Sequence, residues 1–257
     1  MSNLKTRCIG AVFVALLIVL MFVHPYALYF CYLFLGSCML IELGNAVHIK
    51  PWTAISFHVI SLALMLWRGE SGFLYWFILL LSFTTIRTVL VSSRGDVNLE
   101  KVQNIKLSLM LSLYITGFFS PIIFFSWQML ALLLLLSFGT DTFAYFVGCL
   151  YGKHKLCPLI SPNKSVEGAV GGILGATLLG TLWTYFVLPG TGVGFYVYLP
   201  VLSILSEFGD LFASIIKRKH GIKDYSNLIP GHGGVLDRFD SVLFITAILY
   251  VCYHINI

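Results

Sequence analysis

Long apolar runs alternate with short polar loops along the whole chain of 257 residues. A helix needs about 20 mainly apolar residues to cross a lipid bilayer. Nine runs have this character, and they cover residues 8–23, 26–43, 51–68, 72–91, 107–124, 126–149, 168–189, 193–214 and 237–255. The pattern predicts an all-α, polytopic integral membrane protein with about nine transmembrane helices.

The composition supports a surface that faces lipid. Hydrophobic residues make up 58% of the chain and charged residues 11%, whereas soluble domains carry about 25% charged residues. We therefore expect one membrane domain, in which residues 1–106 form scaffold helices and residues 107–257 carry the chemistry. The net charge of +5 is interpreted as basic loops on one side of a membrane, with no nucleic-acid partner.

The basic residues are distributed unevenly when successive loops are assigned to opposite sides. With the N-terminus inside, the outer loops receive only Arg68, and every other lysine and arginine falls inside. Short basic loops stay in the cytoplasm, so the N-terminus is predicted to be cytoplasmic and the first run to be a retained helix. At Pro121, either a kink or a turn between two helices fits the pattern.

One polar cluster lies near the end of the sixth apolar run, in "DTFAYFVGCLYGKHK". Asp141, Tyr145, Gly148 and Gly152 are spaced four, three and four apart, so they share one helix face. A carboxylate inside the membrane costs about 2.5–3.5 kcal/mol. Asp141 is therefore either functional or paired with a nearby lysine.

A second cluster, "SPNKSVEG", follows at residues 161–168. Ser161 and Pro162 suggest a turn, and Ser165 is placed to cap the next helix. Glu167 would lie in the first turn of that helix, where the helix dipole favours negative charge. Lys164 offers a point charge to an anion. Ordinary loop and capping chemistry is the alternative for all of these residues.

The third cluster is the longest and begins at Ser206, inside the eighth apolar run. Two helix faces carry acidic side chains here, one with Glu207, Asp210, Ser214 and Lys217, the other with Asp237, Asp240 and Ser241. Carboxylates that come together repel each other unless a cation neutralises them. Mg²⁺ binds one or two carboxylates and completes its shell with phosphate oxygens and water. The cluster therefore predicts a metal site that also binds phosphate.

Basic side chains and glycines surround these carboxylates in the sequence. Positive charge comes from Lys217, Arg218, Lys223 and Arg238, and backbone N–H groups come from Gly231, His232, Gly233 and Gly234. Both kinds of group bind phosphates. The pattern predicts a polyphosphate bound with a metal. The alternative for the basic residues 217–219 is that they mark topology and bind anionic lipid headgroups.

The stretch "SIIKRKHGIKDYSNLIPGHGGVLDRFD", residues 214–240, resembles the signature of phosphatidate cytidylyltransferases (CDP-diacylglycerol synthases). The signature reads S-x-x-K-R, four residues, K-D, a spacer, P-G-H-G-G, two residues, D-R-x-D, and every fixed position is filled. Asp210 and the two earlier clusters also resemble the family, so the likeness covers roughly the C-terminal half. Cys149 and Val166 depart from it, because relatives often carry arginine and an aromatic residue there.

The resemblance implies transfer of CMP from CTP to phosphatidate, which gives CDP-diacylglycerol and pyrophosphate in phospholipid biosynthesis. It implies Mg²⁺ as cofactor, is compatible with a second, monovalent cation and with a homodimer, and places the site on the cytoplasmic side of a cell (inner) membrane. By position, Asp210 and Asp237 would bind metal. The other catalytic residues implied are Asp240, Lys217, Arg218, Lys223, Asp224, His232 and Arg238, and the substrate-binding residues are Asp141, Ser161, Lys164, Ser214, Gly231, Gly233 and Gly234.

Two other functions fit parts of the pattern. A CTP-dependent lipid kinase would use similar groups but would transfer the γ-phosphate and release CDP. A transporter or channel would use Asp141, Asp210 and Asp237 as an ion path. Because the polar residues gather near one membrane face instead of crossing its full depth, transport is the weaker interpretation.

Overall fold

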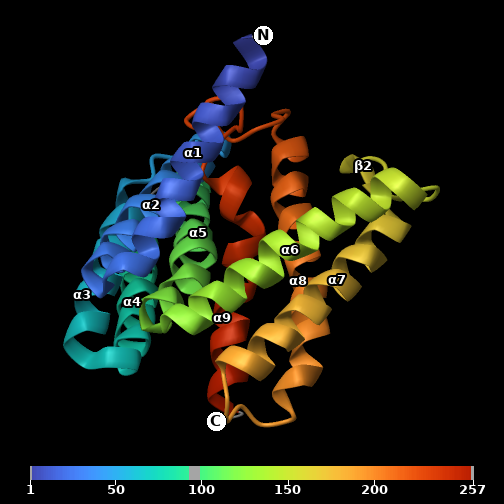
Figure 1. Ribbon diagram of the computed structural model, residues 1–257. Coiled ribbons are helices and arrows are strands. Elements are labelled where there is room, and N and C mark those ends of the chain that lie inside the picture. The colour runs from blue at the N-terminus through green and yellow to red at the C-terminus, as the bar shows by residue number, and fades with distance from the viewer. Residues whose placement is uncertain (1, 93–98, 256–257) are drawn as a thin grey trace. The chain divides into compact units, whose positions relative to one another are not determined.

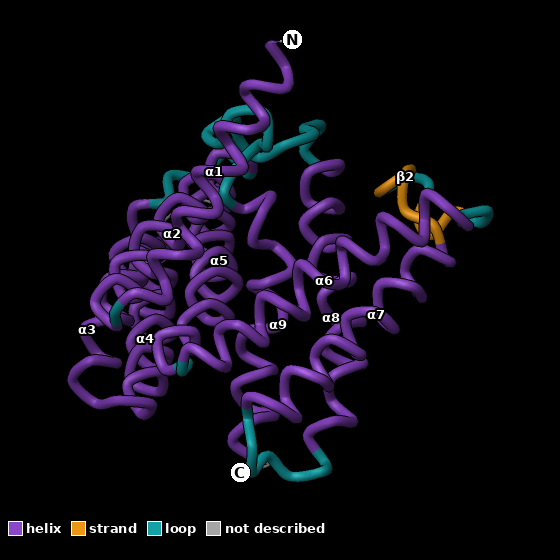
Figure 2. Tube along the Cα trace, in the orientation of Figure 1, coloured by secondary structure: helices purple, strands orange, loops and turns teal. Residues whose placement is uncertain are grey.

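The computed structural model describes residues 2–92 and 99–255, and it is almost entirely helical (Figures 1 and 2). The long helices are α1 (Ser2–Val23), α2 (Pro25–Ala46), α3 (Trp52–Arg68), α4 (Gly72–Ser92), α5 (Leu99–Ser112), α6 (Trp127–Tyr151), α7 (Val166–Val187), α8 (Phe195–Lys219) and α9 (Leu236–Ile255). Shorter helical turns are η1 (Gly69–Ser71), η2 (Leu113–Gly117) and η3 (Ser120–Phe124). Strands β1 (Lys155–Cys157) and β2 (Ser161–Ser165) form a small antiparallel hairpin.

Each predicted apolar run coincides with a helical segment. In the described residues, 8 segments are long and apolar enough to cross a membrane. One of them, Trp52–Val91, contains the third and fourth predicted runs, which η1 separates into α3 and α4. The all-α membrane fold is confirmed, whereas the number of spans and the side of the N-terminus stay predictions.

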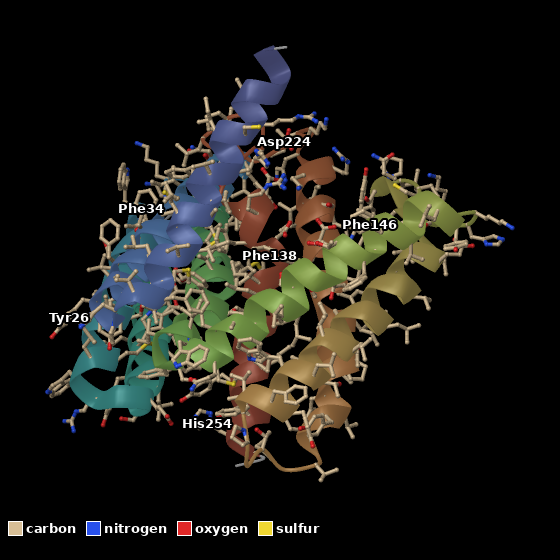
Figure 3. The ribbon with its side chains drawn as sticks, in the orientation of Figure 1. Tyr26, Phe34, Phe138, Phe146, Asp224 and His254 are labelled. Atoms are coloured by element: carbon tan, nitrogen blue, oxygen red, sulfur yellow. The ribbon has the colours of Figure 1, made fainter. Side chains whose placement is uncertain are left out.

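Large apolar side chains cover the outer surfaces of the helices. Tyr26 on α2 and Phe146 on α6, both labelled in Figure 3, are 76% and 57% exposed. Many further aromatic and aliphatic side chains on these helices are equally exposed. Apolar surface on this scale is unfavourable in water and marks a contact with lipid or protein. This surface agrees with helices that stand in a bilayer.

The helices form two compact units. The first contains residues 1–123 and 225–236, and the second contains residues 124–224 and 237–257. Helices α1 to α5 therefore belong to the first unit, together with the glycine-rich turn of the signature. Helices α6, α7 and α8 and nearly all of α9 belong to the second. The functional division at residue 106 stays a prediction.

The helical segment that contains Pro121 continues to Phe124, and the break before α6 lies at residues 125 and 126. Pro121 lies in η3, and α6 begins at Trp127. The Ser126 hydroxyl accepts a hydrogen bond from the backbone N–H of Met129 and so caps α6. Capping satisfies one of the N–H groups that a helix start leaves without a partner.

Polar side chains inside the first unit are hydrogen-bonded to one another. Buried His58 has one ring nitrogen 3.1 Å from the Thr116 hydroxyl and the other 3.1 Å from the Tyr32 carbonyl oxygen. Trp76 donates its indole N–H to the Phe57 carbonyl. Because an unbonded polar group is costly away from water, these bonds join the helices as well as satisfy the groups.

Helices α6 and α7 lie side by side in the second unit because small residues line their contact (Figure 1). A Cβ atom on Gly172 would lie 2.7 Å from the Thr140 carbonyl oxygen and 3.0 Å from Ala144 Cβ. No real Cβ tolerates the shorter distance, and the obstacle is backbone. Small residues at such contacts let membrane helices approach closely.

Replacing Gly172 with alanine should therefore destabilise the second unit. We expect the Gly172→Ala variant to lose about 1–3 kcal/mol, the usual cost of overpacking, and to unfold at a lower temperature in detergent. Gly139→Ala is the matched control on α6, because its Cβ would make only ordinary contacts of 3.6 Å or more. Equal melting temperatures for the two variants would contradict this account of the contact.

Candidate active site

The β-hairpin and its link to α7 bring the "SPNKSVEG" residues into a defined conformation. The predicted turn at Ser161 and Pro162 is wrong, because both residues lie in β2 and Ser161 pairs with Cys157. Strand pairing here overrides the local preference for a turn. The predicted cap is confirmed, since Ser165 Oγ accepts the N–H of Gly168 at 3.1 Å. The Glu167 carboxylate accepts the backbone N–H groups of residues 153 and 154, which fastens the preceding loop.

Lys164 projects from β2 onto two carboxylates of α8. Its ammonium nitrogen lies 2.5 Å from Glu207 Oε2 and 2.8 Å from Asp210 Oδ2. The three side chains are 20%, 7% and 25% exposed, respectively. One ammonium here faces two carboxylates, so the ionised triad keeps a net negative charge in a place with little exposure to water. The second and third polar clusters of the sequence are thus in direct contact through Lys164.

The pKa of Lys164 follows from this environment. Burial alone would lower it, but the charges and hydrogen bonds of Asp210 and Glu207 outweigh burial and hold the pKa above its ordinary value. A raised lysine pKa means that the triad contributes its full stability below the unfolded value of about 10.4 and loses it only as pH rises through the folded pKa.

The raised pKa of Lys164 predicts how the stability difference between wild type and the Lys164→Met variant depends on pH. The melting temperatures of wild type and Lys164→Met should differ by a constant amount between about pH 7 and about pH 9.5. The measurement is thermal unfolding in detergent at several pH values in that range. A difference that shrinks steadily across the range would contradict the raised pKa.

A pocket of about 460 Å³ lies beside Lys164 in the second unit. From α6, the predicted face contributes Asp141, Tyr145 and Gly148. A Cβ on Gly148 would lie 3.1 Å from Ser165 Oγ, so this glycine allows β2 and α6 to approach each other. The pocket combines acidic, basic and apolar walls, which suits a ligand that has a charged head and an apolar body.

A second ion pair joins α8 to α9. Lys217 Nζ lies 2.7 Å from Asp237 Oδ1, and these side chains are 10% and 3% exposed. One turn further along α9, Asp240 is also buried. The helices approach closely because Gly209 faces α9: a Cβ there would lie 3.0 Å from the Asp240 carbonyl oxygen. Asp210, the next residue, is thereby brought toward Asp240.

The acidic side chains of this cluster act on one another electrostatically. The charges of Asp210, Lys217 and Asp141 all reach Asp240. Among the buried oxygens that have no hydrogen-bond partner among the described atoms, three lie on α8 and α9 in this cluster, namely those of Ser206 (Oγ), Glu207 (Oε1) and Asp240 (Oδ2). Buried polar atoms are nearly always bonded, so these oxygens are available to accept a cation or a polar ligand.

The residues present fit a magnesium ion that shares its shell with a substrate. Across residues 2–92 and 99–255, no three histidine, cysteine or acidic side chains are gathered so as to hold a metal by themselves. Mg²⁺ needs only one or two carboxylates when phosphate oxygens and water supply the rest. Asp210 and Asp237, the predicted ligands, are both beside lysines that phosphates also attract.

Other predicted residues of the second unit have varied surroundings. Arg218 donates hydrogen bonds of 3.2 Å to the backbone carbonyls of Ile160 and Ile222, which tie the end of α8 to the loops around it. Lys223 and Asp224 are exposed (Figure 3 labels Asp224). Ser214 is buried on α8, and Arg238 is partly exposed on α9.

The glycine-rich turn belongs to the first unit. Gly231 and Gly233 have φ angles of 72° and 86°, which glycine adopts without strain. The N–H of His232 donates to the Ile229 carbonyl at 2.9 Å. The turn itself uses this donor, and the predicted anion cradle of the glycine-rich turn stays a prediction.

An acidic side chain that was not among the predicted site residues holds this turn. Glu42 of α2 is 3% exposed, and its carboxylate accepts hydrogen bonds from Ser226, Val235 and Leu236. The only sequence signal was a lone glutamate in an apolar run, with no spacing to connect it to partners so distant in the chain.

Comparison with known proteins agrees with these features. A model of the cytidylyltransferase family matches residues 5–256. The chain belongs to this family. It is 34% identical to the phosphatidate cytidylyltransferase of Thermotoga maritima over 274 residues, which cover 99% of this chain and 98% of the relative. The relatives of the same name from Bacillus subtilis and Staphylococcus haemolyticus are 48% and 43% identical over 113 residues, which is 44% of this chain and 42% and 44% of theirs.

Membership of the cytidylyltransferase family covers far more of the chain than the signature alone. The match begins within α1 and ends at the last residues, so the apolar helices of the first half belong to the family as well. Helices α1 and α2 are therefore as much a part of the family structure as the acidic cluster in α8 and α9.

Proposed function

We propose that this protein is a phosphatidate cytidylyltransferase of the bacterial inner membrane, with its site on the cytoplasmic side. A phosphate oxygen of phosphatidate attacks the α-phosphorus of CTP, and the bond from that phosphorus to the β-phosphate oxygen breaks. The products are CDP-diacylglycerol and pyrophosphate. The observation that carries the proposal is the cluster of buried carboxylates and lysines around Lys164 and Asp237, in a chain that matches the family over its whole length.

The proposed reaction brings two anions together, so its main obstacles are charge repulsion and positioning. Lys164 and Lys217 each lie within salt-bridge distance of a carboxylate, and an incoming phosphate can compete for their charge. The phosphatidate oxygen is already negative, so no general base is required. His232 is thus not needed for proton transfer.

Mg²⁺ fits this site through Asp210 and Asp237. When bound, it would neutralise charge on the phosphates of CTP. The chain's own contribution is to hold the two carboxylates on separate helices: Lys164 and Lys217 keep them oriented. The pocket beside Lys164, which has both charged and apolar walls, suits a lipid whose headgroup must reach these side chains.

The experiment that tests the proposal is a transfer assay with purified protein in detergent. CTP labelled on its α-phosphate is supplied with phosphatidate and Mg²⁺, with and without a chelator. We expect label in the lipid phase that depends on the metal, together with pyrophosphate. Label that enters lipid only from the γ-position would instead establish a CTP-dependent lipid kinase, and no label in lipid from either position would refute the proposed reaction.

A further inference from the structure

Glu42 is a buried charge whose hydrogen bonds all go to one segment. Oε1 accepts the Ser226 hydroxyl at 2.6 Å and the Val235 N–H at 2.9 Å, and Oε2 accepts the Leu236 N–H at 2.8 Å. Glu42 lies on α2, about 190 residues earlier in the chain. One side chain thus holds both ends of the segment that contains the glycine-rich turn.

The chemistry of these donors explains why an acidic residue is required. Val235 and Leu236 stand where α9 begins, and the first N–H groups of a helix have no partner within it. An anion at this end is further favoured by the helix dipole. The ion pairs among the described residues do not include Glu42. Its charge is therefore balanced by N–H and O–H dipoles, which is the condition for burying a carboxylate.

The motif suggests that Gly234 offers a backbone N–H to phosphate, but the structure gives another reason for a glycine here, which is the closeness of Glu42. A Cβ on Gly234 would lie 2.6 Å from Glu42 Oε2 and 2.7 Å from Oε1. Any side chain at this position would push the carboxylate away from the backbone. The last glycine of "PGHGG" therefore makes room for Glu42.

We propose that Glu42 is a positioning residue, which fixes the turn between Ser226 and Leu236 and the point at which the chain enters α9. Asp237 follows Leu236 directly, so a shift of the Leu236 backbone reaches this carboxylate through one peptide bond. Glu42 contacts no reacting group. The inference rests on the proposed function.

The decisive variant is Glu42→Gln, which keeps the shape but replaces one accepting oxygen with an NH₂ group that donates. At least one of the three donors then loses its acceptor. We expect kcat for CDP-diacylglycerol formation to fall on the order of 100-fold, the scale of a displacement of about 1 Å at a site. Hydrogen exchange at the amides of Val235 and Leu236 should become faster. Glu42→Asp, which keeps the charge, should recover part of both.

The matched control is Glu100→Gln, which removes an exposed carboxylate from another helix of the first unit. It should leave kcat and the exchange of Val235 and Leu236 as in wild type. A folded Glu42→Gln protein with wild-type kcat would overturn the proposal. So would a loss of kcat without faster exchange at these two amides.

If Glu42→Gln does not fold, Ser226→Ala is the second test. It removes the hydrogen bond from Ser226 to Glu42, together with the one that Ser226 Oγ accepts from the Leu228 N–H at 3.1 Å, and it keeps the buried charge and both N–H contacts of Glu42. We expect a fall in kcat of about threefold, the scale of one hydrogen bond, with faster exchange at Val235. Unchanged kcat and exchange would overturn the proposal. If wild type itself transfers no CMP, the proposed function fails, and the exchange measurements still judge whether Glu42 anchors the turn.

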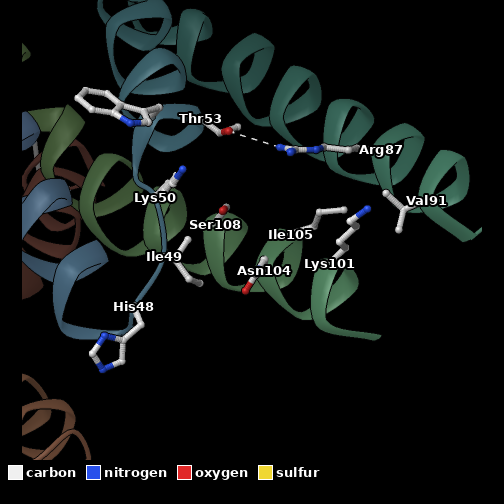
Figure 4. A pocket seen from close by; sticks show the side chains of 11 residues that line it. His48, Ile49, Lys50, Thr53, Arg87, Val91, Lys101, Asn104, Ile105 and Ser108 are labelled. Atoms are coloured by element: carbon white, nitrogen blue, oxygen red, sulfur yellow. Dashed lines mark hydrogen bonds between the residues drawn. The ribbon is translucent and has the colours of Figure 1, made fainter. Parts of the chain in front are cut away.

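A basic pocket in the first unit supports a second, independent inference. This pocket of about 540 Å³ lies between the α2–α3 link, α4 and α5 (Figure 4). Its charged lining consists of Lys50, Arg87 and Lys101, with His48 at the edge, and none of the side chains described as lining it is acidic. The Arg87 guanidinium is oriented by a 3.4 Å hydrogen bond to Thr53 Oγ1.

The remaining lining makes the pocket amphipathic. Ile49 and Ile105 form apolar wall, and Trp52 is exposed beside them. Basic pockets between transmembrane helices bind phosphate headgroups, and an exposed tryptophan is typical of the headgroup level. We infer that this pocket binds the phosphate of an anionic phospholipid.

The test is thermal unfolding of the intact protein in neutral detergent with three separate additives: dioctanoyl phosphatidylglycerol, dioctanoyl phosphatidylcholine and inorganic phosphate. Phosphatidylglycerol, which is not a substrate of the proposed reaction, should raise the melting temperature of wild type. It should not raise that of the Lys50→Gln/Arg87→Gln/Lys101→Gln variant. Lys106→Gln, on α5 but outside the pocket, is the control and should respond as wild type does.

Equal stabilisation by phosphatidylcholine, or the same response in the triple variant, would overturn this inference. Stabilisation by inorganic phosphate alone would overturn the lipid as ligand and would assign the pocket to a free phosphate anion.

Discussion

Replacing Asp237 with asparagine is expected to reduce cytidylyl transfer by about 1,000-fold, the loss that follows removal of a strong electrostatic contact at a reaction centre. Asp237 is 3% exposed, lies 2.7 Å from Lys217 and is a proposed ligand of Mg²⁺. Asparagine has nearly the same shape but no charge. The metal would lose a charged ligand, and the Lys217 ammonium would lose its counter-ion.

The lost counter-ion also affects folding, so two variants separate the effects. Breaking one partner of a buried pair costs about 3 kcal/mol. Asp237→Asn/Lys217→Met removes both charges and should unfold at a higher temperature than Asp237→Asn while remaining inactive. Glu70→Gln, an exposed acidic residue in η1, is the control for the transfer assay. Activity of Asp237→Asn within fivefold of wild type would remove Asp237 from the site.

The helices could be predicted because the signal for each lies within its own segment. A run of apolar residues as long as the bilayer is thick is sufficient evidence for a helix, whatever it packs against. The prediction failed at Ser161 and Pro162, where turn preference was read from two residues alone. Their strand conformation comes from pairing with β1, which is a non-local interaction.

The candidate site could be predicted in part for a similar reason. Helical spacing places Glu207 and Asp210 on one face, and their contact with Lys164 is compatible with the charges of all three. Spacing along one segment cannot show which distant side chain completes a cluster. Glu42 illustrates this limit, because its donors lie about 190 residues away and its neighbours in the sequence are apolar. The family signature, residues 214–240, contains the hydrogen-bond donors Ser226, Val235 and Leu236 but not their acceptor, Glu42.

The second large effect is expected for Lys164→Met. This change leaves the carboxylates of Glu207 and Asp210 close together without their shared cation. We expect a loss of stability of about 3 kcal/mol, as for other broken buried pairs, and a transfer activity below one hundredth of wild type, on the order of the loss of one key charge contact. Thermal unfolding and the labelled-CTP assay measure the two effects on the same preparation.

The double variant Lys164→Met/Glu207→Gln tests whether Lys164 also binds a substrate phosphate, in addition to neutralising the two carboxylates. With one carboxylate neutralised, the remaining negative charge of Asp210 no longer faces a second one, so the melting temperature should recover in part. Activity should not recover, because a phosphate entering the site still lacks the ammonium group that would bind it. Lys155→Met, an exposed lysine on β1, is the matched control and should resemble wild type in both measurements. Wild-type kcat/KM in the double variant would show that Lys164 serves only to neutralise Glu207 and Asp210.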